Sequence, residues 1–247
     1  MEKLSLQEII SAVHGSYGYP ADVEISDIST DTRTIKPGSL FIALKGENFD
    51  GHNFAAKAME LGAEAVVTER PVEGARCMIV DSTARALLDI AGYYRSKFDV
   101  KVVGVTGSVG KTSTKEVIAS VLKEKYRTLK TQGNFNNELG LPLTVFRLRE
   151  EDQIAVLEMG ISDFGEMSRL TKIARPDTCV ITNIGTCHLE NLGDRDGVLK
   201  AKTEIFKCMN PEGHIVLNGD DDKLASVSEY NGIKPVFFGL DENRDVY

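Results

Sequence analysis

The chain has 247 residues, of which 42% are hydrophobic and 27% charged, and its formal net charge is −8 at pH 7. These values are typical of a globular protein with one or two domains. The acidic balance argues against a general nucleic-acid binder, because such proteins bind phosphates through basic side chains. No apolar run reaches the roughly 18–20 residues of a membrane-spanning helix, and the N-terminus does not resemble a secretory signal. The four cysteines form no CxxC pair, which is typical of reduced thiols, so we expect a cytoplasmic protein.

Residues 1–82 mix short apolar segments with helical patterns, which predicts a small α/β domain. Ser5, followed by Glu8 three residues later, is a capping-box pattern at the start of a first helix. The predicted strands are 23–28, 40–44, 65–68 and 78–80, and a second predicted helix over 52–61 ends before Gly62. Residues 83–98 have helical periodicity and are expected to connect this domain to the next one.

Residues 83–247 form the second predicted domain, in which apolar strands alternate with helices. This alternation is typical of a mostly parallel sheet with helices on both faces. The predicted strands are 102–106, 126–131, 154–158, 179–183, 214–218 and 235–238, and the predicted helices or helical turns are 112–125, 137–148, 163–174, 195–209 and 221–230. The sequence stops soon after the last strand, so we expect this domain to be incomplete.

The strongest local signal is the segment from Gly104 to Thr112, where an apolar strand runs into the turn TGSVGKT and then a helix. Glycines allow backbone N–H groups to converge on phosphate oxygens, and the helix N-terminus adds partial positive charge. Lys111 can reach the β- and γ-phosphates, and the Thr112 hydroxyl can ligate Mg2+. Val105 replaces the first glycine of the usual GxxxxGK[ST] pattern, so the match is imperfect. We predict a nucleoside triphosphate site formed by Thr106, Gly107, Ser108, Gly110, Lys111, Thr112 and Ser113.

Three further residues of the second domain are candidate site residues: Glu158, His188 and Lys202. Glu158 closes the strand IAVLE and is expected at the same sheet edge as the phosphate loop, where its carboxylate can ligate Mg2+. His188 follows the strand CVITNIG, and on its own it is more typical of a loop histidine than of a metal ligand. Lys202 stands near Lys200 in a basic run, which alone indicates a solvated helix face.

Several polar clusters also have ordinary structural explanations. Asn134 and Asn137 lie in a glycine- and asparagine-rich segment that alone indicates a turn. The sequence Asp50-Gly-His52 fits a turn with a helix cap. Arg33 and Lys45 can pair with phosphates, whereas Asn218 and the acidic residues after it fit the N-terminus of a helix.

Several sequence segments, in this order, carry a family resemblance. They are STDTRTIKPGSLFIALKGENFDGHNF (29–54), TGSVGKTSTKE, TQGNFNNELGLPLT (131–144), LEMG (157–160), NIGTCHLENLG (183–193) and AKTEIF (201–206). Together they resemble the Mur ligase family over essentially the whole chain. The resemblance is strongest to the members that add D-alanyl-D-alanine to UDP-N-acetylmuramoyl-tripeptide in peptidoglycan precursor synthesis.

The resemblance implies an ATP-dependent carboxylate–amine ligase that works through an acyl phosphate. It implies ATP and two Mg2+ ions as cofactors. It assigns catalytic roles to Lys111, Glu158, His188 and Lys202, and metal ligation to Thr112, Glu158, His188 and Lys202. In this family the residue at the position of Lys202 is a carbamylated lysine, so the resemblance implies that modification here.

The resemblance also implies where the substrates bind. It places Ser29, Thr30, Arg33, Lys45, Asp50 and His52 around the uridine nucleotide, Asn134 and Asn137 near its pyrophosphate–sugar part, and Asn218 near the adenine of ATP. Residues 1–82 are then the UDP-substrate domain and 83–247 the ATP-binding central domain. Family members have a third, C-terminal domain, so we expect an N-terminal fragment of such a ligase, monomeric, without nucleic-acid partners or stable membrane insertion.

Two alternative functions remain open at this point. One is another amide ligase of the same superfamily, such as a different Mur ligase or a folylpolyglutamate-type enzyme, and the segment 29–54 argues against it. The other is a non-catalytic nucleotide-binding module or a GTPase-like switch. Guanine specificity typically needs an NKxD-type motif, which the sequence lacks.

Overall fold

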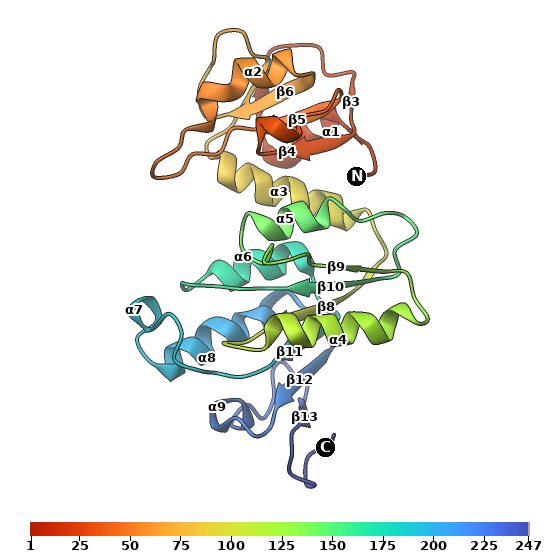
Figure 1. The fold of residues 1–247 in the computed structure, drawn as a ribbon, viewed down its shortest axis with the longest axis vertical. Helices are drawn as coiled ribbons and strands as arrows, with labels where there is room; N and C mark the ends of the chain where they lie inside the picture. The colour runs from red at the N-terminus through yellow and green to blue at the C-terminus, as the bar shows by residue number, and fades with distance from the viewer. Residues whose placement is uncertain (247) are drawn as a thin grey trace. The chain divides into compact units, whose positions relative to one another are not determined.

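A computed structural model describes residues 1–246 and divides them into two compact units (Figure 1). The first unit contains Met1–Phe98 and Val145–Glu150, and the second contains Asp99–Thr144 and the chain from Glu151 onward. Both units combine helices with sheets, which confirms the predicted α/β class. Within residues 1–246, no helix has the length and apolar character needed to cross a membrane.

The first unit is built on a five-stranded sheet with the strand order β2-β7-β6-β5-β4. Its strands are β2 (Ser16–Tyr17), β4 (Asp27–Ser29), β5 (Ser39–Ile42), β6 (Ala63–Thr68) and β7 (Cys77–Ile79). Only β2 pairs antiparallel; the other three pairings are parallel. A separate antiparallel pair joins β1 (Leu4–Ser5) to β3 (Glu24–Ile25).

Three α-helices and two 3-10 turns complete this unit. They are α1 (Leu6–Val13), α2 (Ala55–Glu60), α3 (Thr83–Ser96), η1 (Thr32–Thr34) and η2 (Gly51–Phe54). The capping box predicted for α1 is confirmed, since Ser5 Oγ accepts from Glu8 N at 3.2 Å and Glu8 Oε2 accepts from Ser5 N at 2.9 Å. Helix α3 belongs to this unit, where it packs on α1.

The second unit contains a six-stranded sheet in the order β13-β12-β11-β8-β10-β9, and all its pairings are parallel. The strands are β8 (Lys101–Thr106), β9 (Thr128–Lys130), β10 (Ile154–Glu158), β11 (Thr178–Ile181), β12 (His214–Asn218) and β13 (Val236–Phe238). The helices are α4 (Lys111–Lys123), α5 (Gly140–Val145), α6 (Glu166–Ala174), α7 (Leu189–Leu192), α8 (Arg195–Thr203), the 3-10 turn η3 (Glu204–Cys208) and α9 (Asp222–Ala225).

Helical segments cover both faces of this sheet, as predicted. Val105 of β8 packs with Ala119 of α4 in one buried cluster. The neighbouring Gly104 faces the opposite side, because successive strand residues alternate between faces. A Cβ at Gly104 would lie 2.5 Å from a Met159 carbon and 3.3 Å from Ile205 of η3, so this face is filled as well.

Element boundaries differ from the prediction in a few places. The predicted strand 23–28 is two strands, because β3 pairs with β1 whereas β4 pairs with β5. The predicted helix 195–209 continues after Thr203 as the 3-10 turn η3, and the helix expected over 221–230 is only the four-residue α9. The two-residue strands β1 and β2 and the four-residue helix α7 were not predicted, because elements this short leave no periodic pattern in the sequence.

Candidate nucleotide and metal site

The loop between β8 and α4 requires glycine at two positions. Gly107 has φ 145°, and a Cβ there would lie 1.9 Å from Thr182 Oγ1. Gly110 has φ 80° immediately before the first turn of α4, a left-handed conformation that glycine adopts without strain. These two positions bring the end of β8 around to the N-terminus of α4, where the helix places free N–H groups and partial positive charge.

The end of β11 holds this loop in place. Asn183 Oδ1 accepts from the backbone N–H groups of Ser108 and Val109 at 3.2 and 3.0 Å. The Thr182 hydroxyl donates to Val109 O at 2.6 Å, and Ser108 Oγ accepts from Gly185 N at 2.8 Å. The loop conformation is therefore fixed by the adjacent strand.

Two of the predicted nucleotide-binding residues, Thr106 and Lys111, flank the loop at the end of β8 and the start of α4. Lys111 Nζ donates to Gly107 O at 3.0 Å and Ser108 O at 3.2 Å, so it reaches across the loop. Thr106 Oγ1 is buried and has no hydrogen-bond partner within residues 1–246. Ser113, by contrast, is exposed on the outer side of α4.

Glu158, at the end of β10, meets this loop. Its carboxylate is 1% exposed and accepts from Thr112 Oγ1 at 3.1 and 3.0 Å. Asn136 Nδ2 donates to the same carboxylate at 2.8 Å, and Glu158 N donates to Thr131 Oγ1 at 3.0 Å. The parallel register, which sets Glu158 opposite Val105, accounts for this meeting. Carboxylate and hydroxyl oxygens are donors that suit Mg2+.

Two residues that the sequence reasoning did not select lie in this cluster. Asn136 contacts Glu158, whereas the sequence pointed to its neighbours Asn134 and Asn137, and those as substrate-binding residues. Lys115 is fully buried, with its Nζ 3.5 Å from Glu158 Oε2. A signal for Lys115 existed, because a residue four positions after Lys111 lies on the same face of the helix.

Lys202 of α8 is 2% exposed, whereas Lys200 is exposed with its Nζ 5.6 Å from the centre of the Phe164 ring. Burial, opposed by Cys187 and assisted by the Lys111 charge, lowers the pKa of Lys202 to about 8. Lys200 and Lys202 are only two positions apart on α8, yet Lys200 is solvated whereas Lys202 is buried and loses its proton more easily than an ordinary lysine. The pKa effect also shows that Lys202 lies near Lys111.

His188 lies immediately before α7, in a left-handed conformation with φ 56°, and is exposed. Within residues 1–246, no three His, Cys, Asp or Glu side chains are grouped so that they could hold a metal ion. Of the four predicted metal ligands, Thr112 and Glu158 are therefore the two whose side-chain oxygens the structure brings into contact.

The asparagines have separate positions in the second unit. Asn137 Oδ1 accepts from Leu139 N and Gly140 N at 3.2 and 2.8 Å, which caps α5. Asn134 is exposed. Asn218 Nδ2 donates to Thr182 O at 3.0 Å and thereby joins the ends of β12 and β11.

In the first unit, the segment after β4 is held by its own polar groups. Ser29 Oγ donates to Asp31 O at 2.8 Å and contacts Thr34 Oγ1 at 2.7 Å. Asp31 caps η1 and pairs with Arg33, which lowers the pKa of this carboxyl to about 2. The Arg33 side chain is 86% exposed, and Thr30 is half-buried.

His52 is buried and has two fixed partners. Its Nε2 accepts from Glu69 N at 2.9 Å, so the proton resides on Nδ1, which donates to Asp50 Oδ1 at 2.6 Å. The His52 N–H groups, together with Arg70, lower the pKa of Asp50 to about 2. Lys45 pairs with Asp50 only through a backbone bridge, and its side chain is exposed.

Comparison with known proteins places this architecture in a family. The profile of the Mur ligase middle domain matches residues 105–247, and that of the Mur ligase family catalytic domain matches residues 24–95. The chain belongs to the Mur ligase family.

Three similar proteins illustrate the relationship. The UDP-N-acetylmuramoyl-tripeptide–D-alanyl-D-alanine ligase of Bacillus subtilis is 44% identical over 92% of this chain and 51% of its own length. A crystal structure of MurF from Acinetobacter baumannii superposes with a TM-score of 0.92 at 37% identity, over 99% of this chain and 55% of that one. The Thermotoga maritima MurF ligase in complex with ADP gives a TM-score of 0.80 at 39% identity, over 86% of this chain and 50% of that one. This Mur ligase chain thus spans about half the length of the curated relatives it matches.

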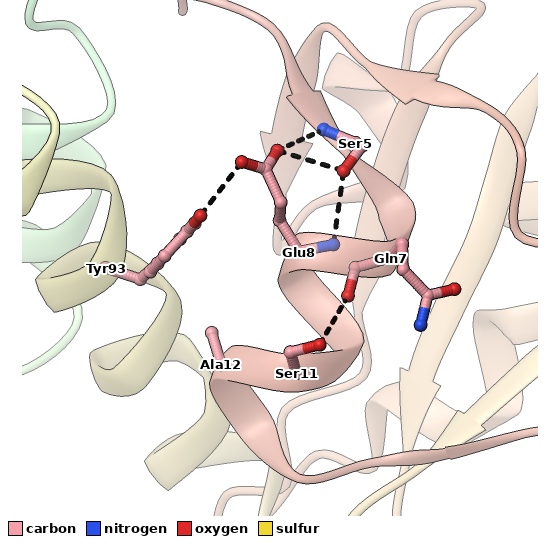
Figure 2. A pocket seen from close by; sticks show the side chains of 6 residues that line it. All are labelled: Ser5, Gln7, Glu8, Ser11, Ala12 and Tyr93. Carbon is pink, nitrogen blue, oxygen red and sulfur yellow. Dashed lines mark hydrogen bonds between the residues drawn. The ribbon is translucent and has the colours of Figure 1, made fainter.

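The first unit of this Mur ligase chain also has a pocket of about 500 Å3 beside α1 and α3, lined by Ser5, Gln7, Glu8, Ser11, Ala12 and Tyr93 (Figure 2). Glu8 is the charged residue of this lining. The carboxylate accepts from Ser5 N at 2.9 Å, from Tyr93 Oη at 2.9 Å and from Lys97 Nζ at 2.5 Å. Glu8 therefore serves the helix cap and the α1–α3 contact.

Proposed function

We propose that this chain is the nucleotide- and substrate-binding part of an ATP-dependent ligase that joins D-alanyl-D-alanine to UDP-N-acetylmuramoyl-tripeptide. The names of its relatives and the ADP-bound neighbour support the reaction and the nucleotide. The observation that carries the proposal is the meeting of Thr112 and Glu158 beside the glycine-rich loop. A buried lysine with a lowered pKa, Lys202, lies near the same loop.

The loop and Lys111 bind the ATP phosphates in this proposal. The Lys111 ammonium exchanges the Gly107 and Ser108 carbonyls for the β- and γ-phosphate oxygens, which are stronger, charged acceptors. The N-terminus of α4 adds its N–H groups to the same phosphates. Transfer of the γ-phosphoryl group to the tripeptide carboxylate then gives an acyl phosphate, which the amine of D-alanyl-D-alanine attacks with loss of phosphate.

Thr112 and Glu158 would hold one Mg2+, and His188 with Glu158 and a modified Lys202 would hold a second. Bound Mg2+ offsets the repulsion between the γ-phosphate and the substrate carboxylate. Asn136 orients the Glu158 carboxylate through its 2.8 Å hydrogen bond.

Lys202 is proposed to carry a carbamate. The neutral amine attacks CO2, an N–C bond forms, and the nitrogen loses a proton to solvent, which leaves an anionic oxygen ligand. Because burial lowers the pKa of Lys202 to about 8, about a tenth of the amine is neutral at pH 7, far more than for an ordinary lysine.

The UDP end of the substrate is proposed to bind the first unit. Arg33 and Lys45 are exposed cations there, and they suit a pyrophosphate. Phe49 and Phe54 add an exposed, stacked aromatic pair with ring centres 5.3 Å apart. Ser29, Asp50 and His52 hold the backbone of these segments through hydrogen bonds, and together with the half-buried Thr30 they are proposed to lie around the uridine nucleotide. Asn218 at the end of β12 is proposed to lie near the adenine.

Isothermal titration tests this proposal with two ligands, UDP-N-acetylmuramoyl-tripeptide and Mg-ATP, together with a phosphate-release assay in the presence of D-alanyl-D-alanine. We expect both ligands to bind. The variant Arg33→Ala should weaken only the first ligand, and Lys111→Ala only the second, by about tenfold or more. Failure of the wild-type chain to bind either ligand would overturn the proposal.

A further inference from the structure

Lys115 is one of the largest fully buried side chains of the protein, and its environment is unusual for a lysine. Its Nζ lies 3.5 Å from Glu158 Oε2 and 3.2 Å from Glu116 Oε1. Despite these distances, it forms no well-oriented hydrogen bond with any residue in 1–246. The ammonium is therefore held by charge rather than by hydrogen bonding.

Glu116 extends this arrangement to the surface of the unit, because its other oxygen accepts from Lys130 at the end of β9. The result is a charged row of alternating sign, formed by Glu158, Lys115, Glu116 and Lys130. Glu158 at one end of the row is 1% exposed, whereas the side chains of Glu116 and Lys130 are 45% and 29% exposed.

Packing alone does not require a charge at this position. Burying an ammonium group without hydrogen bonds is costly, and replacing a buried ion pair by apolar side chains of similar volume is often neutral or stabilising. A methionine would fill much of the same space. The presence of a lysine beside the carboxylate that contacts Thr112 points to an electrostatic role in the site.

We propose that Lys115 is a buried counter-charge of the nucleotide site, which opposes binding of free divalent metal at Glu158 and favours binding of phosphate. This inference rests on the proposed function, since it concerns the same loop and carboxylate. Lys115 lies one helical turn after Lys111, on the same face of α4. A positive charge there repels a cation at Glu158 and attracts an anion at the start of the helix, so metal enters mainly with the nucleotide.

The test uses two neutral variants, Lys115→Met and Lys115→Gln, each checked for folding by thermal unfolding. Mn2+ alone is titrated by electron paramagnetic resonance, and ADP in the presence of EDTA is titrated by calorimetry. We expect Mn2+ to bind roughly tenfold more tightly and metal-free ADP roughly tenfold more weakly than in the wild type. A purely structural role would weaken both ligands together, so the opposite signs identify the charge effect.

Lys130→Met is the matched control, because it removes the same charge from the far end of the row without touching Glu158. We expect its effect on either ligand to stay within about twofold, since Lys130 is separated from Glu158 by Lys115 and Glu116 and is partly open to solvent screening. Suppose that the wild type binds Mg-ADP but both Lys115 variants bind Mn2+ no more tightly than the wild type does. That result would overturn the proposed role of Lys115 and leave the proposed function standing. Absence of Mg-ADP binding to the wild type would overturn the proposed function as well.

Discussion

In the first unit, the predicted substrate-binding motifs around Asp31 and Asp50 bond mainly to close neighbours in the sequence. In the second unit, the partners of Glu158 come from distant parts of the chain. Asp31 pairs with Arg33, and Asp50 with His52, each only two residues away. Glu158, in contrast, bonds to Thr112, 46 residues earlier in the sequence. A contact between residues close in the sequence stabilises a local turn. A contact between residues far apart in the sequence brings different chemical groups together in one site.

The sheets account for this difference. Six parallel strands place all their carboxyl ends at one edge, so residues that follow separate strands converge there. The sheet of the first unit has an antiparallel strand and short loops whose polar groups bond within the same loop. Substitutions in the two units should therefore differ in what they disturb.

The largest effect is expected at Lys202. A carbon-13 bicarbonate experiment should show a lysine carbamate signal in the wild type that is lost in Lys202→Met and kept in Lys200→Met. The signal should rise between pH 7 and 9, because the pKa of Lys202 is lowered to about 8 and the neutral amine accumulates as pH passes that value. A signal that survives in Lys202→Met would place the modification elsewhere.

A glycine comparison contrasts the two units directly. Gly107→Ala should lower the free energy of unfolding by about 2–4 kcal/mol, because its φ is 145° and the new Cβ would collide with Thr182 Oγ1. Gly92→Ala in α3, where nothing lies within 4 Å of the new Cβ, should instead be neutral or stabilising by up to about 1 kcal/mol. Urea denaturation measures both changes. Equal stability of the two variants would contradict the loop geometry.

His52 tests whether the polar motifs of the first unit are mainly structural. His52→Leu removes the imidazole hydrogen bond to Asp50 and leaves the Glu69 N–H group without its acceptor, so we expect a loss of about 2–3 kcal/mol in the free energy of unfolding. Binding of Mg-ADP should be unchanged in the folded variant. Wild-type stability combined with lost affinity for the UDP substrate would show that His52 contacts the ligand instead.

The smallest effect is expected at Glu8 in the pocket beside α1. The pKa of Glu8 is lowered to about 2, chiefly by Lys97, so its contribution to stability is present above its usual pKa of 4.5 and is lost as pH falls toward 2. Because the side chain is partly exposed, the contribution should stay below about 1 kcal/mol. The unfolding temperature should therefore fall slightly more between pH 7 and pH 3 in the wild type than in Glu8→Gln. Parallel curves would refute this role.

The sequence allowed the architecture of the second unit to be predicted because its strands are apolar runs separated by helices. The strand 214–218 was predicted with its observed bounds, and the proximity of Glu158 to Thr112 follows from parallel topology alone. The α1 cap was predictable from Ser5 and Glu8, since both partners lie within one turn.

Other features depend on three-dimensional packing that leaves no local pattern. The burial of Lys202 could not be read from a basic run that resembles a solvated helix face, and the spacing of Lys115 from Lys111 indicates a shared helix face but not burial. The choice of Asn136 for the contact with Glu158 depends on the turn conformation, in which Asn137 caps α5. The split of 23–28 at Ser26 follows from pairing with two different strands.

The most direct test of the account is a crystal structure of this chain grown with Mg-ADP and bicarbonate. We predict the ADP phosphates on the loop 107–112, with Lys111 Nζ moved from the Gly107 and Ser108 carbonyls to phosphate oxygens. We also predict a metal ion in contact with Thr112 and additional density on the Lys202 amine. Nucleotide bound away from this loop, or an unmodified Lys202 with Lys111 still on the carbonyls, would contradict it.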